Sequence, residues 1–87
     1  MGETRLSAAC TVQVLLFASL RDRAGWSSRP FTLSAHTLCT PQAIWQLLDL
    51  GAWPGGVRVA VNQSFVAADH PLNDGDELAF LPPFTGG

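Results

Sequence analysis

The sequence predicts an α+β fold, in which a small mixed β-sheet is covered on one face by one main helix. Three observations lead to this prediction: 87 residues suffice for one small domain, strand-like apolar runs lie near both ends of the chain, and a helical repeat of apolar residues lies between them. A chain of this size buries only about 60% of the surface that its unfolded form exposes. We therefore expect a compact sheet and helix, with little room for a deep active-site cleft.

The first predicted strand covers residues 12–20, "VQVLLFASL", a run of β-branched and apolar residues. Both of its faces are largely apolar, with Val14 and Leu16 on one face and Leu15 and Phe17 on the other. Such a pattern is typical of a strand inside a sheet, so we expect this strand to be central and covered on both sides.

Two short elements are predicted next. The segment "RDRAG" indicates a short helical turn that ends at Gly25. In "RPFTLSA", Phe31 and Leu33 alternate with Thr32 and Ser34, which predicts a half-buried second strand.

The main helix is predicted over "TPQAIWQLLDLG". The Thr40 hydroxyl can cap its first turn, and Pro41 fits the first helical position because that N–H has no partner within the helix. Gly51 is placed to end the helix. One face carries the apolar residues Ile44, Leu47 and Leu48.

The last third of the chain predicts three strands. "GVRVAVNQSFVA" gives two strands joined by a turn at Asn62-Gln63, "NDGDE" is a turn in which Gly75 can take a positive φ, and "ELAFLPP" is a strand ended by prolines. If this last strand pairs parallel to the first, the connection between them is right-handed. That arrangement is a β-grasp.

The composition predicts a partner surface. Charged residues make up 14% of the chain, against about 25% in a typical protein, and hydrophobic residues make up 47%. We therefore expect an exposed apolar patch of the kind that marks an interaction site. A net charge of −2, with five Arg and no Lys, argues against nucleic-acid binding. No apolar run is long enough for a membrane span and no signal peptide is evident, so we expect a cytoplasmic protein.

The sequence offers no catalytic or metal-binding set of residues. Cys10 and Cys39 form no C-x-x-C pair; a disulfide between them is open, but free thiols in a reducing compartment are favoured. The histidines lack companion ligands at metal spacing. Asp69-His70 and "NDGDE" are interpreted as turns, and the three tryptophans as packing or partner contacts in preference to a ligand platform. We expect no bound cofactor.

The end of the chain, "LPPFTGG", predicts an extended arm over residues 82–87. Two prolines favour an extended backbone, and six residues span roughly 20 Å at about 3.3 Å each. Because Gly86 and Gly87 lack side chains, the tip can enter a narrow channel of another protein and deliver the C-terminal carboxylate. We expect residues 12–81 to form the folded domain and residues 1–11 a disordered extension.

A carboxylate is ionised at neutral pH and is a poor electrophile. To carry a group it must be activated, for instance as an acyl-adenylate, and then captured by a sulfur or nitrogen nucleophile. The chain has no Gly-rich phosphate-binding loop, so a partner enzyme must perform the activation.

The C-terminal third of the chain resembles the small subunit of molybdopterin synthase, the MoaD family. The resemblance covers roughly residues 12–87 and is carried by Val61-Asn62-Gln63, Asp69-His70-Pro71-Leu72, Asp74-Gly75-Asp76-Glu77, Pro82-Pro83 and Gly86-Gly87. It implies the β-grasp fold of ubiquitin and a sulfur carrier. An E1-like adenylyltransferase would activate Gly87 with ATP, and a sulfur donor would convert it to a thiocarboxylate.

The resemblance also implies a partner and a substrate. The arm would enter the large synthase subunit within a heterotetramer, where its sulfur makes the dithiolene of molybdopterin from cyclic pyranopterin monophosphate. Phe84 is bulkier than the β-branched residue often found at that position in the family, which suggests an adapted channel.

We predict contacts with the large subunit from the arm and from the sheet. They comprise Pro82, Pro83, Phe84, Thr85 and Gly86 and, on the uncovered face of the sheet, Phe80 with Phe65. In the opposite arrangement, Phe80 belongs to the core and Ala79 and Leu81 point outward. Three other functions stay open: a thiamin-type sulfur carrier, a ubiquitin-like modifier joined to lysines through Gly87, and a plain interaction module.

Overall fold

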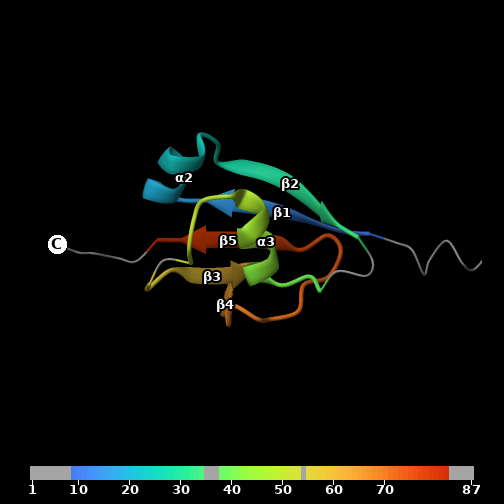
Figure 1. Cartoon of the computed structure of the whole chain (residues 1–87). Coiled ribbons are helices and arrows are strands. Elements are labelled where there is room, and N and C mark those ends of the chain that lie inside the picture. The colour runs from blue at the N-terminus through green and yellow to red at the C-terminus, as the bar shows by residue number, and fades with distance from the viewer. Residues whose placement is uncertain (1–8, 35–37, 54, 83–87) are drawn as a thin grey trace, which may run out of the picture.

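The computed structural model describes residues 9–34, 38–53 and 55–82. In these residues five strands form one mixed sheet with the order β2-β1-β5-β3-β4, and two helices accompany it (Figure 1). The elements are β1 (Cys10–Leu16), α2 (Ala18–Ala24), β2 (Ser28–Leu33), α3 (Pro41–Leu48), β3 (Arg58–Val61), β4 (Ser64–Val66) and β5 (Glu77–Leu81).

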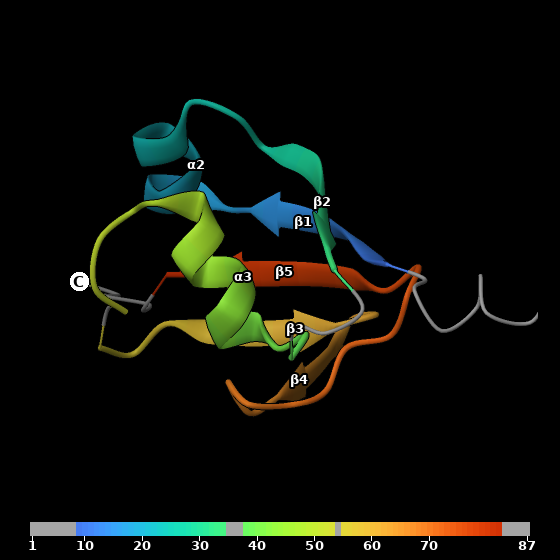
Figure 2. The ribbon, with the colours of Figure 1, turned by 45° about the vertical axis from the view of Figure 1, so that its right-hand side comes forward.

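The strand pairing confirms the predicted β-grasp. β5 lies in the middle of the sheet, parallel to β1 and antiparallel to β3, while β1–β2 and β3–β4 are antiparallel pairs. α3 crosses one face of the sheet in both views of the ribbon (Figure 1, Figure 2). β1 begins at Cys10, two residues earlier than predicted, and residues 1–8 of the predicted extension lie outside the described residues.

The first strand differs from the prediction in two respects. It ends at Leu16, because Phe17 is the extended N-cap residue of α2 and the chain then turns into that helix. It is also covered on one face only: Val12 and Val14 are fully buried, whereas Gln13 on the other face is exposed. The apolar residues on the second face therefore do not lie under another layer.

Capping was predicted at three helix ends, and the structure confirms it at two of them. Gly25 ends α2 with φ +85°, and the Thr40 hydroxyl accepts a hydrogen bond of 3.2 Å from the backbone N–H of Ala43 at the start of α3. The prediction was wrong at the end of α3, where Asp49 rather than Gly51 is the C-cap in the left-handed region. Asp and Asn tolerate this region better than other residues with a side chain.

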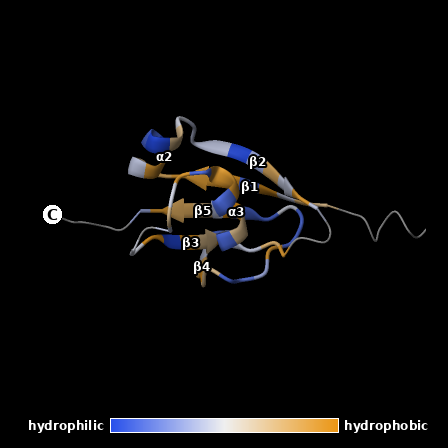
Figure 3. Cartoon of the chain, viewed as in Figure 1, coloured by the Kyte–Doolittle hydropathy of each residue, from blue (hydrophilic) through white to orange (hydrophobic). Residues whose placement is uncertain are grey.

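The core lies between α3 and the sheet. The side chains of Ile44 and Trp45 on α3 are buried, whereas Leu47, predicted on the buried face, is 48% exposed. Trp45 packs edge-on against Trp53 and Phe80, with ring centroids 5.6 and 5.2 Å away. Hydropathy colouring shows apolar residues along β1 and β5 and polar ones in the turn that leads into β5 (Figure 3).

The structure describes no helix that is both apolar enough and long enough to traverse a lipid bilayer, within residues 9–34, 38–53 and 55–82.

Candidate functional site: the open sheet face beside the C-terminal arm

The predicted arm starts where β5 ends. Pro82, half-buried, follows Leu81 directly. The predicted contact residues Pro83, Phe84, Thr85, Gly86 and Gly87 lie outside the described residues. The site is therefore built here from the sheet that carries the arm.

The sheet places Phe80 and Phe65 on opposite faces. Phe80 is 0% exposed and contacts Trp45 beneath α3, so the prediction that it lies on the uncovered face was wrong. Phe65 is 63% exposed, as expected for a surface residue. The alternation along β5 then puts Ala79 and Leu81 on the face opposite α3, the arrangement that the sequence had left as the alternative.

One row of residues crosses the uncovered face at the same level of all five described strands. Leu15 pairs with Ala79, Ala79 with Ala60, and Ala60 with Phe65, and Ser28 extends the row onto β2. Residues directly opposite one another share a face of the sheet. Leu81 and Arg58 form the next pair toward the arm. We call the apolar residues of these two levels, Leu15, Ala60, Phe65, Ala79 and Leu81, the open-face row.

The open-face row is apolar but not covered. Leu15 and Leu81 are half-buried and Phe65 is exposed, while the small side chains of Ala60 and Ala79 are shielded by their neighbours. Phe17, 43% exposed, follows the end of β1 on the same side of the molecule as the exit of β5, because the two strands run parallel. The other end of the face carries polar residues, among them Thr11, Gln13 and Thr32. The apolar part therefore lies toward the arm.

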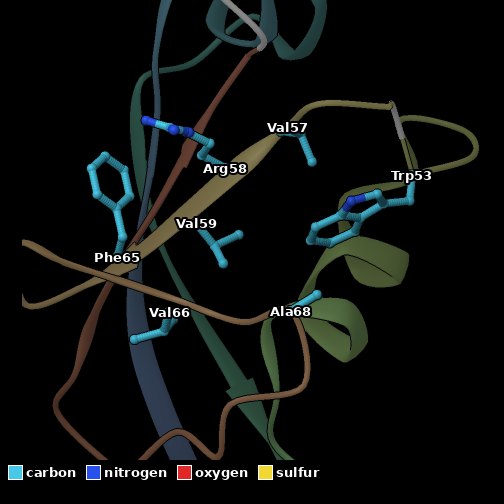
Figure 4. A pocket seen from close by; sticks show the side chains of 7 residues that line it. All are labelled: Trp53, Val57, Arg58, Val59, Phe65, Val66 and Ala68. Carbon is cyan, nitrogen blue, oxygen red and sulfur yellow. The ribbon is translucent and has the colours of Figure 1, made fainter.

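Arg58 borders this surface. Its guanidinium carbon lies 5.0 Å from the centroid of the Phe65 ring, a cation–π arrangement that supports the ring on the exposed face. Both side chains lie on one side of β3, and Trp53 lies on the other, toward α3 (Figure 4). A pocket of about 300 Å³ runs around this edge, lined by Trp53, Val57, Arg58, Val59, Phe65, Val66 and Ala68.

The motif residues that carried the family resemblance have structural partners. Asn62 and Gln63 both have positive φ. The Asn62 side chain binds the start of β5: its amide donates to the carboxylate of Asp76, the residue before the strand, and its oxygen accepts from the Glu77 N–H, each at 3.0 Å. Asp76 also accepts from the backbone N–H of Asn73 at 2.8 Å. The "VNQ" and "DGDE" motifs thus hold β3, β4 and β5 together, in agreement with their interpretation as turns.

Among the described residues, Asp69 and His70 do not form a catalytic pair. Asp69 and His70 are both exposed in a turn, where the His70 N–H donates to the Ala67 carbonyl. No group of three or more His, Cys, Asp or Glu side chains stands close enough to bind a metal ion within the described part of the chain. Trp45 and Trp53 pack in and beside the core, as the packing interpretation expected.

The packing of Trp45 was expected from the sequence, but its contact with Phe80 was not. Its indole, 3% exposed, fills the space above β5 and donates a 2.9 Å hydrogen bond to the Gly51 carbonyl. The signal was present in the helical repeat, because Trp45 follows the buried Pro41 by four positions and precedes Leu48 by three. A large ring there selects Phe80, rather than Ala79, as the neighbour on the sheet.

Comparison with known proteins places this geometry in a family. The ThiS family matches residues 14–87. The molybdopterin synthase sulfur carrier subunit of Escherichia coli is 40% identical over 83 residues, which cover 87% of this chain and 99% of that protein. The Chlamydomonas reinhardtii protein of the same name is 36% identical over 81 residues, covering 87% of this chain and 98% of the relative.

Solved structures agree on the fold. Small archaeal modifier protein 1 of Haloferax volcanii superposes with a TM-score of 0.71 at 22% identity, over 86% of this chain and 99% of that one. The Methanosarcina acetivorans protein of the same name gives a TM-score of 0.68 at 23% identity, over 92% of this chain and 99% of that one. The resemblance to the molybdopterin synthase small subunit is thus confirmed by sequence, and the chain belongs to the ThiS family of β-grasp proteins.

Proposed function

We propose that this protein is the sulfur carrier subunit of a molybdopterin synthase. The observation that carries the proposal is its agreement with the Escherichia coli subunit of that name, at 40% identity over 99% of that protein's length. Two features of this chain support it: the "PPFTGG" end, and the apolar surface beside the point where the arm leaves the sheet.

The carried group is bound at Gly87. An E1-like adenylyltransferase joins the Gly87 carboxylate to the AMP part of ATP and releases pyrophosphate. A sulfide-level donor (hydrosulfide) then attacks the activated carbonyl carbon through its sulfur, the C–O bond to AMP breaks, AMP leaves, and loss of the S–H proton gives the thiocarboxylate. The reactive steps take place on the partners. ATP is a substrate of the partner and is not bound by this chain.

The large synthase subunit is the partner of the open-face row. Phe65, Leu81 and Leu15 offer apolar contacts, with Phe17 at the margin, and the arm begins next to Leu81. Docking of this surface brings the arm to the partner's active site, where the sulfur is transferred to cyclic pyranopterin monophosphate. The cytoplasm, where Cys10 and Cys39 stay reduced, is the compartment we propose.

Intact-mass spectrometry of the chain tests this proposal. After incubation with the adenylyltransferase, ATP and a sulfur donor, the expected product is heavier by the difference between one sulfur and one oxygen atom. A chain lacking Gly87, which keeps the whole sheet, should give no such product. The thiocarboxylate form should then make molybdopterin with the large subunit.

The same experiment separates the other functions. A protein modifier yields a ladder of lysine conjugates in cell extract, and a thiamin-type carrier forms the thiocarboxylate without supporting molybdopterin synthesis. Either result, or full sulfur transfer by the chain without Gly87, would contradict the proposal.

A further inference from the structure

Two thiols meet at the end of the sheet that lies opposite the arm. Cys10 is the first residue of β1, and Cys39 stands immediately before Thr40, the N-cap residue of α3. The two residues are 29 positions apart in sequence, yet their Sγ atoms lie 2.9 Å from each other. Both thiols are free in the structure.

The backbone holds both cysteines in place. Cys10 pairs with Leu33 in the β1–β2 ladder, and the Cys39 carbonyl accepts a 2.8 Å hydrogen bond from the N–H of Leu72. Leu72 is itself buried in the core. The contact between the sulfurs is therefore a product of the fold and not of two mobile surface side chains.

We propose that Cys10 and Cys39 form an oxidisable dithiol site, which a peroxide converts to an intramolecular disulfide. A disulfide holds its sulfurs about 2.05 Å apart, so the two Sγ atoms have to approach by less than about 1 Å. This site is separate from the proposed sulfur-carrier function and does not depend on it.

The two thiols differ in environment, which assigns their order of reaction. Cys10 is half-buried and accessible, whereas Cys39 is only 9% exposed. Burial, followed by the hydrogen bond with Cys10 and the negative charges of Cys10 and Asp76, raises the pKa of the Cys39 thiol to about 12. Cys39 thus keeps its proton, and Cys10 is the thiol that meets the oxidant.

The proposed reaction balances in two steps. The Cys10 sulfur attacks one oxygen of hydrogen peroxide, the O–O bond breaks, the Cys10 thiol proton joins the leaving oxygen as water, and a sulfenic acid remains. The Cys39 sulfur then attacks the Cys10 sulfur, the S–O bond breaks, and the hydroxide leaves with the Cys39 proton as a second water. The peroxide is reduced by two electrons, which the two thiols supply.

The disulfide would tie the start of β1 to the start of α3. Closing a loop of this length restricts the unfolded chain and stabilises the fold. β1 and β5 run parallel, so the disulfide at the start of β1 lies at the opposite end of the sheet from the end of β5, where the arm begins (Figure 1). Oxidation is therefore expected to stabilise the domain and leave the arm accessible.

The experiment uses the reduced full-length chain, with Gly87 as its free carboxylate, treated with one equivalent of hydrogen peroxide. Intact mass under denaturing conditions should fall by two hydrogen atoms, and peptide mapping should join the Cys10 and Cys39 peptides. Tm should rise by about 10 °C or more, and it should return to the value of the reduced protein when dithiothreitol is added. A monomer that keeps both thiols, or that gains oxygen atoms without losing hydrogen, would overturn the proposal.

Two variants test the order of reaction. In Cys39→Ala the Cys10 sulfenic acid has no partner and should be trapped by dimedone, whereas in Cys10→Ala the buried Cys39 should react far more slowly. Rapid trapping at Cys39 would overturn the assigned order. Whether the disulfide forms is decided by the mass and Tm of the wild-type protein, and this result does not depend on the stability of the variants.

Discussion

Trp45 on α3 packs edge-on against Phe80 on β5, with ring centroids 5.2 Å apart and ring planes at 62°. This pair joins the helix to the middle strand of the sheet and determines which face of β5 is buried. Leu78, two positions from Phe80 on β5, is then buried on the same face, and Leu81, one position away, faces outward beside the arm.

Replacement of the buried ring should unfold the domain. In Phe80→Asp a carboxylate would stand at a position that is 0% exposed, against Trp45 and Trp53, without a charged partner. The lost packing alone costs about 3–5 kcal/mol, a large part of the 5–15 kcal/mol that stabilise a typical domain. Circular dichroism should show a chain that is unfolded or melts far below wild type. A variant with the Tm of the wild-type protein would show that Phe80 lies on the surface and not in the core.

Replacement of the exposed ring should leave the fold intact and weaken binding. Phe65→Asp changes a 63% exposed side chain and removes the cation–π contact with Arg58, worth about 0.5–1 kcal/mol. Loss of an apolar anchor from the open-face row should weaken binding to the large synthase subunit by about 30-fold, or roughly 2 kcal/mol. Titration calorimetry and a thermal melt on the same sample measure both effects.

Thr32→Asp is the matched control for that experiment. Thr32 is exposed on the same face of the sheet but lies at its polar end, away from the arm. Its replacement adds the same charge and should leave the affinity within about twofold of wild type. Equal losses in both variants would mean that charge, rather than the open-face row, determines binding.

Most of the fold could be predicted from local chemistry. Thr40, Pro41, Gly25 and the "NDGDE" turn each fix the backbone through a nearby hydrogen bond or an allowed φ, so their effects can be read from a few residues. In contrast, local chemistry could not predict which side of β5 is buried. Leu78 and Phe80 alternate with Ala79 and Leu81, all four are apolar, and the choice depends on Trp45, which is distant in sequence.

Only those parts of the candidate site that depend on local sequence could be predicted. The Gly-Gly end and the motif around Asp76 are sequence features, whereas the open-face row exists only once four strands align Leu15, Ala79, Ala60 and Phe65. The contact between Cys10 and Cys39 likewise depends on strand β1 and the start of α3 meeting at Leu72.

The motif aspartate should act on stability and not on sulfur chemistry. In Asp76→Ala the side chain of Asn62 and the N–H of Asn73 both lose an acceptor. We expect a cost of about 1–3 kcal/mol and a lower Tm. At a temperature where the variant is folded, its rate of thiocarboxylate formation should match wild type. A wild-type Tm with slow sulfur transfer would instead assign Asp76 a role in contacting a partner.

The arm is tested by Phe84→Ala. If the Phe84 ring anchors the arm in the large subunit, its truncation should weaken binding by roughly tenfold or more, because buried aromatic anchors commonly contribute about 2 kcal/mol. Tm should stay within about 2 °C of wild type, since the prediction places Phe84 in the arm and not in the folded domain of residues 12–81. Unchanged affinity, measured by the same calorimetry, would exclude Phe84 as an anchor.

The thiol pair predicts how stability depends on alkaline pH. The pKa of Cys39 is raised from 9.0 to about 12 in the folded protein, chiefly by burial and then by the contact with Cys10 and the charge of Asp76. The folded state therefore binds a proton that the unfolded state loses first, so this stabilisation is complete below pH 9 and declines as the pH rises from 9 to 12.

This chain suits that measurement because it contains no Lys and no Tyr, whose side chains would otherwise titrate in the same range. Reduced wild-type protein should lose stability to urea steadily between pH 9 and 12. Cys39→Ala should start from a lower stability at pH 8, because a buried side chain has been shortened, but should lose much less of it on the way to pH 12. Parallel curves for the two proteins would show that the Cys39 thiol ionises as easily in the fold as in the unfolded chain.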